Sequence, residues 1–337
     1  MENESPQLEP PSNGKSSDAP SWGISGEIAK YTAVIAIFVF SIVLLRKKLK
    51  DITWEQMWNG INSIPSDQIA LAILFTAINF VVLTGYDLIA VRYLKKDLPL
   101  PKVMVGAIIG YALSNILGWM IGGTAIRYRL YTSWGFRLIE VIALVSILSV
   151  TFWLGMFMLA GVAFVCFEVK LPEEYAEHLH MAPVYWGYLF LVVVLIYLGA
   201  TLFIRKPIHV GNQEFRFPPF KLSLLQLAVS ASDFALASLV LFVLLPSGSV
   251  DYPTVMVSYL AAMIVVVVLH VPGGFGVLEV VILELLAKEE EGNSPFKIAV
   301  TAGLIAFRGI YYFAPGIFAS LLLAWHEWKH AKKKRRS

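Results

Sequence analysis

Six charged side chains stand in or beside long apolar stretches of this sequence, where ionisable groups are costly and usually have a function. They are Arg127, Arg129, Asp233, Glu279, Glu284 and Arg308. At roughly 2.5 to 3.5 kcal/mol each on an insertion scale, six unpaired charges would cost about 15 to 21 kcal/mol. That exceeds the net stability of a typical domain, about 5 to 15 kcal/mol. The charges must therefore pair, lie in a hydrated cavity or, for Arg127, Arg129 and Glu284, lie near a membrane interface.

The elements that position these charges are those of a membrane protein. Of the 337 residues, 57% are apolar and 15% are charged, and the mean hydropathy is +0.68. A helix needs about 20 apolar residues to cross the hydrocarbon core. Hydropathy predicts eight long spans, near residues 28–45, 68–90, 103–121, 138–165, 184–204, 223–245, 254–270 and 298–325. The expected fold is an all-α polytopic membrane protein.

Two further segments are too short or too charged to be ordinary spans, and each follows glycines. They are residues 124–134, after Gly122 and Gly123, and residues 275–286, after Pro272, Gly273 and Gly274. The order of long helix, glycine break, short helix and long helix thus occurs once in each half. Transporter folds are often internal repeats whose broken helices meet near the membrane midplane. The alternative is coincidence, because glycine is common in membrane helices; if both short helices cross, the halves are inverted repeats.

Helical spacing places several polar residues on shared faces. The groups are Tyr111, Asn115, Gly118 and Gly122; Gln226, Ser230 and Asp233; Arg308, Tyr311, Tyr312 and Pro315; and Arg127 with Tyr131. One interpretation is interhelical contact that packs the bundle. The other is a polar path lined by free helix N-termini, which bind anions. On the second interpretation, the candidate substrate-binding or translocation residues are Asn115, Gly122, Gly123, Arg127, Arg129, Tyr131, Asp233, Pro272, Gly273, Gly274, Glu279, Arg308 and Tyr312.

Four of these residues carry specific expectations. We expect Arg127 to face a lipid phosphate at the polar end of a water-filled groove, because its planar fork binds phosphate bidentately. Arg129, two residues on, should point to nearly the opposite side of the helix. Asp233 and Arg308 should approach one another or share a water, because an isolated charge would cost more than a pair.

Glu279 lies about one turn into the second short helix. It either stabilises the start of that helix or accepts the ammonium of an aminoacyl headgroup. Pro272 and the two glycines after it should end the preceding helix and turn the backbone.

The ends of the chain differ from the middle. Residues 1–27 form a polar tail rich in Pro and Ser, which we expect to be disordered; residues 28–325 form the membrane domain, and residues 326–337 form a basic tail. The distribution of Lys and Arg favours cytoplasmic termini in the cell (inner) membrane, although the RKKLK after the first span lies on the other side. The basic tail should contact anionic lipid headgroups. Trp54, Met57, Trp58 and Ile61 predict a helix between the first two spans, either in the membrane interface or in an ordinary loop.

Three stretches, GGTAIRYRLYTSWG, PGGFGVLE and RGIYYFAP, occur in this order and together resemble a known family. The sequence is similar to the transmembrane domain of bacterial lysylphosphatidylglycerol synthetase, also called the multiple peptide resistance factor, and to its stand-alone flippase-like relatives. The resemblance covers roughly residues 28–325 and implies a lipid-translocating module for aminoacylated or other polar phospholipids. Full-length synthetases continue into a soluble acyltransferase-like domain, whereas this sequence ends at Ser337, so we expect no aminoacyl transfer.

Two other classes of function remain open. One is a nonenzymatic membrane scaffold or accessory subunit, acting beside a separate lipid-modifying enzyme. The other is a membrane enzyme that acts on lipid-linked substrates, although the sequence contains no HExxH motif or other metal pattern. It also contains no P-loop, so we expect no ATP-driven step. We expect no cofactor and no nucleic-acid partner. A proton or ion gradient, with Asp233, Glu279 or Glu284 as carriers, is one driving force; passive movement is the other.

Overall fold

The computed structural model describes residues 39–334, except 41, 51, 168–181, 205–207, 211–212, 216, 288–289 and 291–293. In this part of the chain, seven helices are long and apolar enough to cross a membrane. They are α3 (Ser66–Tyr93), α4 (Leu100–Leu117), α6 (Leu138–Cys166), α8 (Pro183–Phe203), α9 (Phe220–Leu244), α10 (Tyr252–Leu269) and the run Pro295–Lys329. The predicted all-α polytopic fold is confirmed. The predicted tail 1–27 and most of the span 28–45 lie outside the described residues, so the count of eight stays a prediction.

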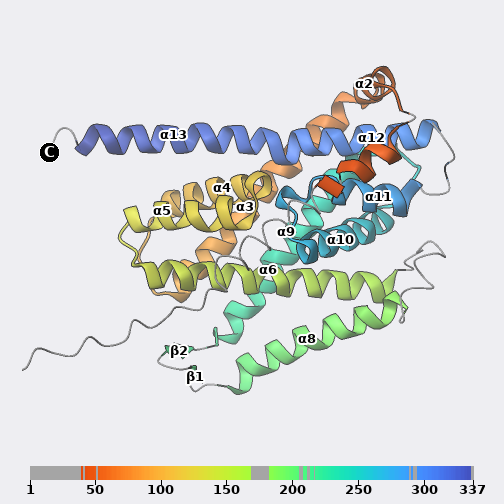
Figure 1. Ribbon diagram of the computed structural model, residues 1–337. Coiled ribbons are helices and arrows are strands. Elements are labelled where there is room, and N and C mark those ends of the chain that lie inside the picture. Colours follow the sequence, from red (N-terminus) through yellow and green to blue (C-terminus); the bar gives the residue numbers. More distant parts are fainter. Residues whose placement is uncertain are drawn as a thin grey trace, which may run out of the picture.

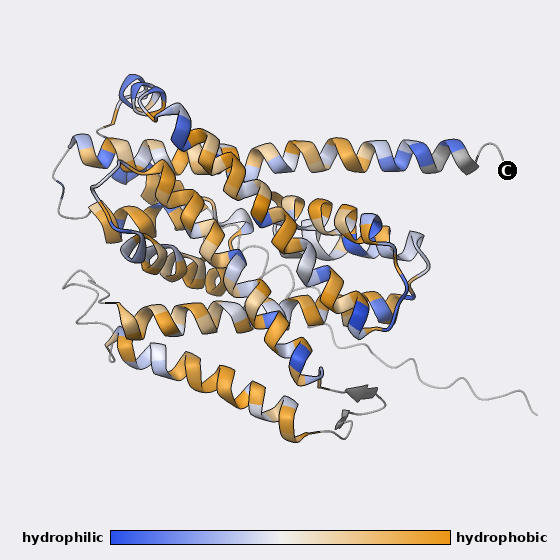
Figure 2. Cartoon of the chain, turned by 180° about the vertical axis from the view of Figure 1, so that it is seen from behind, coloured by the Kyte–Doolittle hydropathy of each residue, from blue (hydrophilic) through white to orange (hydrophobic). Residues whose placement is uncertain are grey.

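The helices form one bundle around α3 and α9, which pack along each other (Figure 1). Helix α6 lies against α9, and α8 lies against α6. A short antiparallel hairpin, β1 (Ile208–Val210) with β2 (Gln213–Phe215), lies in the connection between α8 and α9. The C-terminal part of α13 (Ala314–Lys334) extends past the other helices (Figure 1). Apolar residues cover most of the helix surfaces, and hydrophilic ones gather at the far end of α13 (Figure 2).

Helix α2 (Trp54–Asn62) forms where the tryptophan spacing predicts a helix. Thr53 caps its start: its side chain accepts from the Gln56 backbone, and the Gln56 side chain accepts from the Thr53 backbone. Trp54 and Trp58 are exposed, which suits a helix at the membrane–water interface. The helix itself is confirmed, and its interfacial position stays a prediction.

The first glycine break comes earlier than the sequence indicates. Helix α4 ends at Leu117, and Gly118 follows with φ of +83°, in the left-handed region that favours glycine. A π-helix, η1 (Trp119–Ala125), then leads into the short helix α5 (Ile126–Ser133). Gly122 therefore lies inside η1 rather than at the break. It is needed there for close packing, since a Cβ at this position would lie 2.1 Å from the Leu113 carbonyl oxygen.

The second break lies where it is predicted. Helix α10 ends at Leu269, and Pro272–Gly274 form a single 3-10 turn, η2. Gly273 and Gly274 have φ of +64° and +62°, which L residues other than glycine rarely adopt. The short helix α11 (Val277–Ala287) follows, as expected, and α12 (Pro295–Phe307) begins after the next connection. Helix α12 continues through a π-helix, η3 (Arg308–Phe313), into α13.

Each half of the described chain has the same order of elements: two long helices, a break with a short helix, and a third long helix. In one half these are α3, α4, η1–α5 and α6; in the other they are α9, α10, η2–α11 and α12–α13. The neighbours correspond too, because α3 packs on α4 as α9 packs on α10, and each short segment packs on the long helix before it. The order and the packing support an internal repeat, and its inversion in the membrane stays a prediction.

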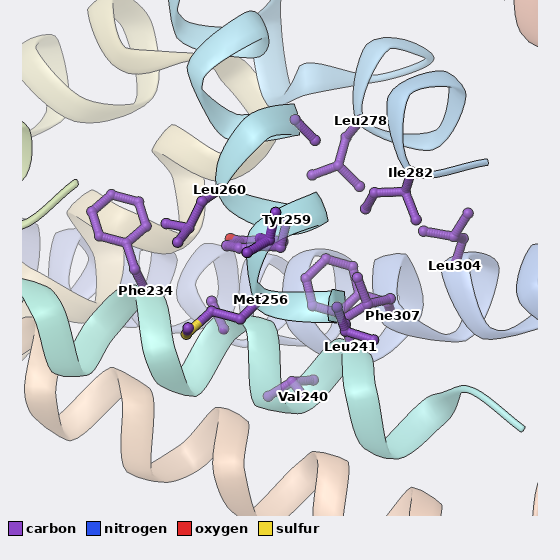
Figure 3. Close-up of a cluster of buried hydrophobic side chains, with 14 of the residues drawn as sticks. Phe234, Val240, Leu241, Met256, Tyr259, Leu260, Leu278, Ile282, Leu304 and Phe307 are labelled. Atoms are coloured by element: carbon purple, nitrogen blue, oxygen red, sulfur yellow. The ribbon is translucent and has the colours of Figure 1, made fainter. Parts of the chain in front are cut away.

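The described residues form two large apolar cores, one centred on each half. Figure 3 shows the core of the second half, where side chains of α9, α10, α11 and α12 converge. Tyr259 and Phe307 pack edge to face at its centre, with ring centroids 6.2 Å apart. The core of the first half joins α3, α4, α5 and α6. The two halves pack against each other along α3 and α9.

Candidate functional site

The first short helix is anchored by a buried ion pair that the sequence analysis missed. Arg127 in α5 donates from Nη2 to Oδ2 of Asp87 in α3 at 3.1 Å, and from Nε to Oδ1 at 3.2 Å. Neither side chain has any exposed surface. The hydroxyl of Tyr131 donates to the same carboxylate at 2.7 Å, and the Tyr111 ring lies 4.3 Å from the guanidinium carbon. Asp87 therefore binds one edge of the planar guanidinium, and the Tyr111 ring covers one of its faces.

This geometry corrects the expectation that Arg127 faces a lipid phosphate in a water-filled groove. Its guanidinium is enclosed, and Gly110 leaves the necessary room, since a Cβ there would lie 2.7 Å from the guanidinium carbon. Arg129 points away, as predicted: its side chain is 67% exposed and pairs with Glu327 of α13 at 2.8 Å. Arg127 is thus a structural link between α5 and α3, and Arg129 is a surface residue.

A second buried ion pair joins the other short helix to the last long helix. Arg308 Nε donates to Oε1 of Glu279 at 2.5 Å. Its two terminal nitrogens donate to the carbonyls of Gly273 at 2.6 Å and Gly274 at 2.9 Å. The guanidinium carbon also lies 4.4 Å from the Tyr312 ring. Arg308 therefore fixes the carbonyl groups that the second break leaves without helical partners.

Glu279 has a second contact that matches one of its two expected roles. Its Oε2 accepts from the backbone N–H of Gly276 at 2.8 Å, at the start of α11. A carboxylate in the first turn satisfies a free N–H and complements the positive end of the helix. The helix-start role is therefore present in the structure, and binding of an ammonium group stays a prediction.

Each short helix carries one member of a buried ion pair, and the two pairs have opposite polarity. In the first half the short helix carries the arginine and a long helix carries the acid; in the second half the short helix carries the acid and a long helix carries the arginine. Within each pair the two charges compensate each other, which lowers the cost of burying them. Glu284, the other acid of the second short helix, pairs with Lys48.

Asp233 does not pair with Arg308, so the predicted direct contact is wrong, and a shared water stays a prediction. Arg308 is bound by Glu279, for which the sequence analysis expected either a role at the helix start or the binding of an ammonium group. Asp233 in α9 instead accepts from the Tyr86 hydroxyl at 2.9 Å. Asn79 Nδ2 donates to the backbone oxygen of Asp233 at 3.4 Å and to the Tyr311 hydroxyl at 2.6 Å. These contacts join α3, α9 and η3 in one buried polar cluster.

The remaining polar stripe on α9 packs helices together. The side chain of Gln226 donates to the Thr151 hydroxyl at 2.7 Å, and Ser230 donates to the Thr151 carbonyl at 2.8 Å. Gly155 lets α6 approach α9 closely, since a Cβ at Gly155 would lie 1.5 Å from the Ser230 hydroxyl oxygen. Interhelical packing, the simpler of the two interpretations, therefore describes Gln226 and Ser230.

The two breaks meet each other. A Cβ on Gly118 would lie 3.5 Å from Pro272, and a Cβ on Gly273 would lie 2.7 Å from the carbonyl oxygen of Asn115. We call this contact between the end of α4 and η2 the junction. The junction brings together predicted site residues from both halves. Arg308 contacts it through the Gly273 carbonyl of η2, and Glu279 pairs with Arg308. Gly123 and Gly274 are buried beside it, and Arg129 lies outside it.

Comparison with known proteins gives a consistent result. A family model described as "Lysylphosphatidylglycerol synthase TM region" matches residues 31–319. The chain is 33% identical to the uncharacterized protein slr0712 of Synechocystis, over 94% of this chain and 97% of that protein. It is 29% identical to the inner membrane protein YbhN of Escherichia coli, over 94% of this chain and 96% of that protein. It is 26% identical to a phosphatidylglycerol lysyltransferase of Staphylococcus aureus, over 91% of this chain but only 35% of the enzyme.

Proposed function

This chain belongs to the family of the lysylphosphatidylglycerol synthase transmembrane region, and from that membership and the geometry of the junction we propose that it is a lipid flippase. Its substrates would be phospholipids with polar or aminoacylated headgroups, which it moves between the leaflets of the inner membrane. Two relatives of nearly the same length, one of them an inner membrane protein by name, match over almost their whole sequences. The family likeness therefore concerns the membrane domain by itself.

The meeting of the two broken helices is the observation that carries the proposal. Irregular backbone is tolerated at membrane depth only where protein buries it or where it lines a polar cavity. In transporters, broken helices from two repeats meet at the substrate site because their free backbone groups bind ions and headgroups. Here Gly118 and Pro272 bring such breaks into contact from both halves.

The contacts of the arginines indicate which one is available to a lipid phosphate. Arg127 is fully enclosed: Asp87 binds one edge of its guanidinium, and Nη1 donates to the Gly123 carbonyl at 3.5 Å. Arg308 lies at the junction and donates to two glycine carbonyls. A phosphate oxygen accepts charge-assisted hydrogen bonds better than a neutral carbonyl. Separation of the breaks would therefore free Arg308 for a phosphate, while Arg127 keeps the first half together.

The basic end of the chain supports contact with the membrane surface. Lys329 lies over the ring of Trp325 at 5.0 Å, and Lys332 lies over the ring of Trp328 at 4.9 Å. Tryptophan and lysine side by side are typical of the interface, where aromatic rings lie at headgroup level and lysine reaches anionic lipids. We place the end of α13 there.

The experiment that tests the proposal is leaflet-resolved lipid transport by the purified chain in liposomes. Aminoacylated and unmodified phosphatidylglycerol are followed separately, beside protein-free liposomes of the same composition. We expect one headgroup class to exchange between leaflets much faster with the protein present. No acceleration of any lipid would favour the scaffold or accessory subunit, and chemical change of the lipid would favour a membrane enzyme.

A further inference from the structure

One buried acid in the centre of the bundle, Asp233, has no cationic partner in the described part of the chain. Asp233 is 8% exposed, and among the described residues no Lys, Arg or His lies within ion-pair distance of its carboxylate. The arginines nearest the breaks are occupied by Asp87 and Glu279. An isolated carboxylate at membrane depth is costly, so its negative charge must be balanced by a bound cation or proton rather than by a basic side chain.

Tyrosine hydroxyl groups lie at the Asp233 cluster. Tyr86 donates to the carboxylate at 2.9 Å, and Tyr311 accepts from Asn79, which also donates to the backbone oxygen of Asp233. Hydroxyl groups both donate and accept hydrogen bonds, so this cluster can adjust to an acid that gains or loses a proton. Other titratable groups stand on helices that pack against α9. Glu140 is bound by Lys96, Tyr197 is bound to Gln226, and Lys297 lies in the first turn of α12.

One polar atom of the same cluster, Asn79 Oδ1, is buried and has no hydrogen-bond partner among the described residues. A buried polar atom without a partner is costly, and in a native structure it calls for an explanation such as a catalytic role or a bound water or ion. Asn79 itself is fixed by its donations to Tyr311 and to the backbone of Asp233, so its free oxygen stays at the cluster.

We propose that Asp233 is an exchangeable proton-binding site of the bundle. A proton from water forms an O–H bond with one carboxylate oxygen, which changes the charge of the cluster from negative to neutral; its release restores the carboxylate. The acid then becomes a donor to the surrounding hydroxyl and amide oxygens. Gradient-driven coupling to lipid movement rests on the proposed function, whereas proton binding itself does not.

Infrared difference spectroscopy of the purified chain, with ¹³C-labelled aspartate, tests proton binding directly. Spectra are compared between about pH 5 and about pH 8, which spans the range above the ordinary titration of an exposed aspartate. We expect a protonated-carboxyl band that changes over this range and is absent from Asp233→Asn. Asp97→Asn, at an exposed aspartate in the loop between α3 and α4, should leave the band unchanged. Tyr86→Phe keeps the acid but removes its donor, and should shift the band.

Three results would overturn the proposal or its coupling. A band that persists in Asp233→Asn shows that another group binds the proton. A band that responds to sodium at constant pH shows a metal cation site instead. Lipid transport that is equal with and without an imposed pH gradient removes the coupling but leaves the proton site. If no lipid moves at all while Asp233 still titrates, the proposed function fails and the proton site stands.

Discussion

Removal of one partner of the Arg127–Asp87 pair should be among the most destabilising conservative changes in this chain. Asp87→Asn preserves size but leaves the arginine charge without a counterion, at a position with no exposed surface. Breaking a buried pair in this way costs about 3–5 kcal/mol. The neighbouring hydroxyl of Tyr131 also loses a charged acceptor at 2.7 Å. We expect a large fall in the midpoint of thermal unfolding in detergent.

The protein contains a matched control for this change. Arg129 and Glu327 form an ion pair of similar length, but their side chains are 67% and 38% exposed. Exposed pairs contribute about 0–1 kcal/mol, so Glu327→Gln should lower the unfolding midpoint several times less than Asp87→Asn. Both variants remove one negative charge from a pair with an arginine of α5, and they differ mainly in burial.

A double variant separates the loss of a charge pair from the loss of packing. Asp87→Asn with Arg127→Gln removes both charges, so no uncompensated charge remains, and its loss should be smaller than the sum of the two single losses. Equal losses for Asp87→Asn and Glu327→Gln, or strict additivity in the double variant, would refute the structural role of this pair.

Further predictions concern the second break. Glu279→Gln keeps an acceptor for the Gly276 N–H but leaves the charge of Arg308 unpaired. We therefore expect the unfolding free energy to fall by about 3–5 kcal/mol and the transport of all lipids to fall equally. A selective loss of transport for cationic headgroups would show that Glu279 binds ammonium instead. Gly273→Ala should destabilise the fold by about 1–2 kcal/mol, because the φ of Gly273 is +64° and the new Cβ would lie 2.7 Å from the Asn115 carbonyl oxygen. Gly199→Ala is the control: a Cβ at this helical position would have no atom within 4 Å, so the change should be close to neutral. Similar effects of the two changes would contradict this account of the junction.

The architecture could be predicted from the sequence because it depends on local patterns. Apolar length identified the spans, and the paired glycines identified both short helices. The opposite directions of Arg127 and Arg129 followed from helical geometry alone. The site of the first break was displaced because Gly118 and Gly122 both suit an irregular backbone, and only the approach to Leu113 shows which of them packs and which one turns.

Partners across the bundle could not be predicted. Asp87 is forty residues from Arg127 and lies in an apolar span that hydropathy treats as ordinary. Its signal was present, since Asn79 and Asp87 are two turns apart on one face of α3. Nothing in the sequence says, however, whether Arg308 meets Asp233 or Glu279, because that depends on how α9 and α11 pack against the last helix.

The most direct test of the account locks the junction. With Cys166 replaced, cysteines at Gly118 and Pro272 would place their Cβ atoms about 3.5 Å apart, within the range of about 3.5–4.5 Å that a disulfide needs. The same protein is then assayed for leaflet-resolved lipid transport in liposomes, oxidised and after reduction, so that any strain from the substitutions is common to both states. We predict that the oxidised protein does not move lipids and that reduction restores transport. Equal transport in the two states would contradict the claim that lipids cross where the two breaks meet.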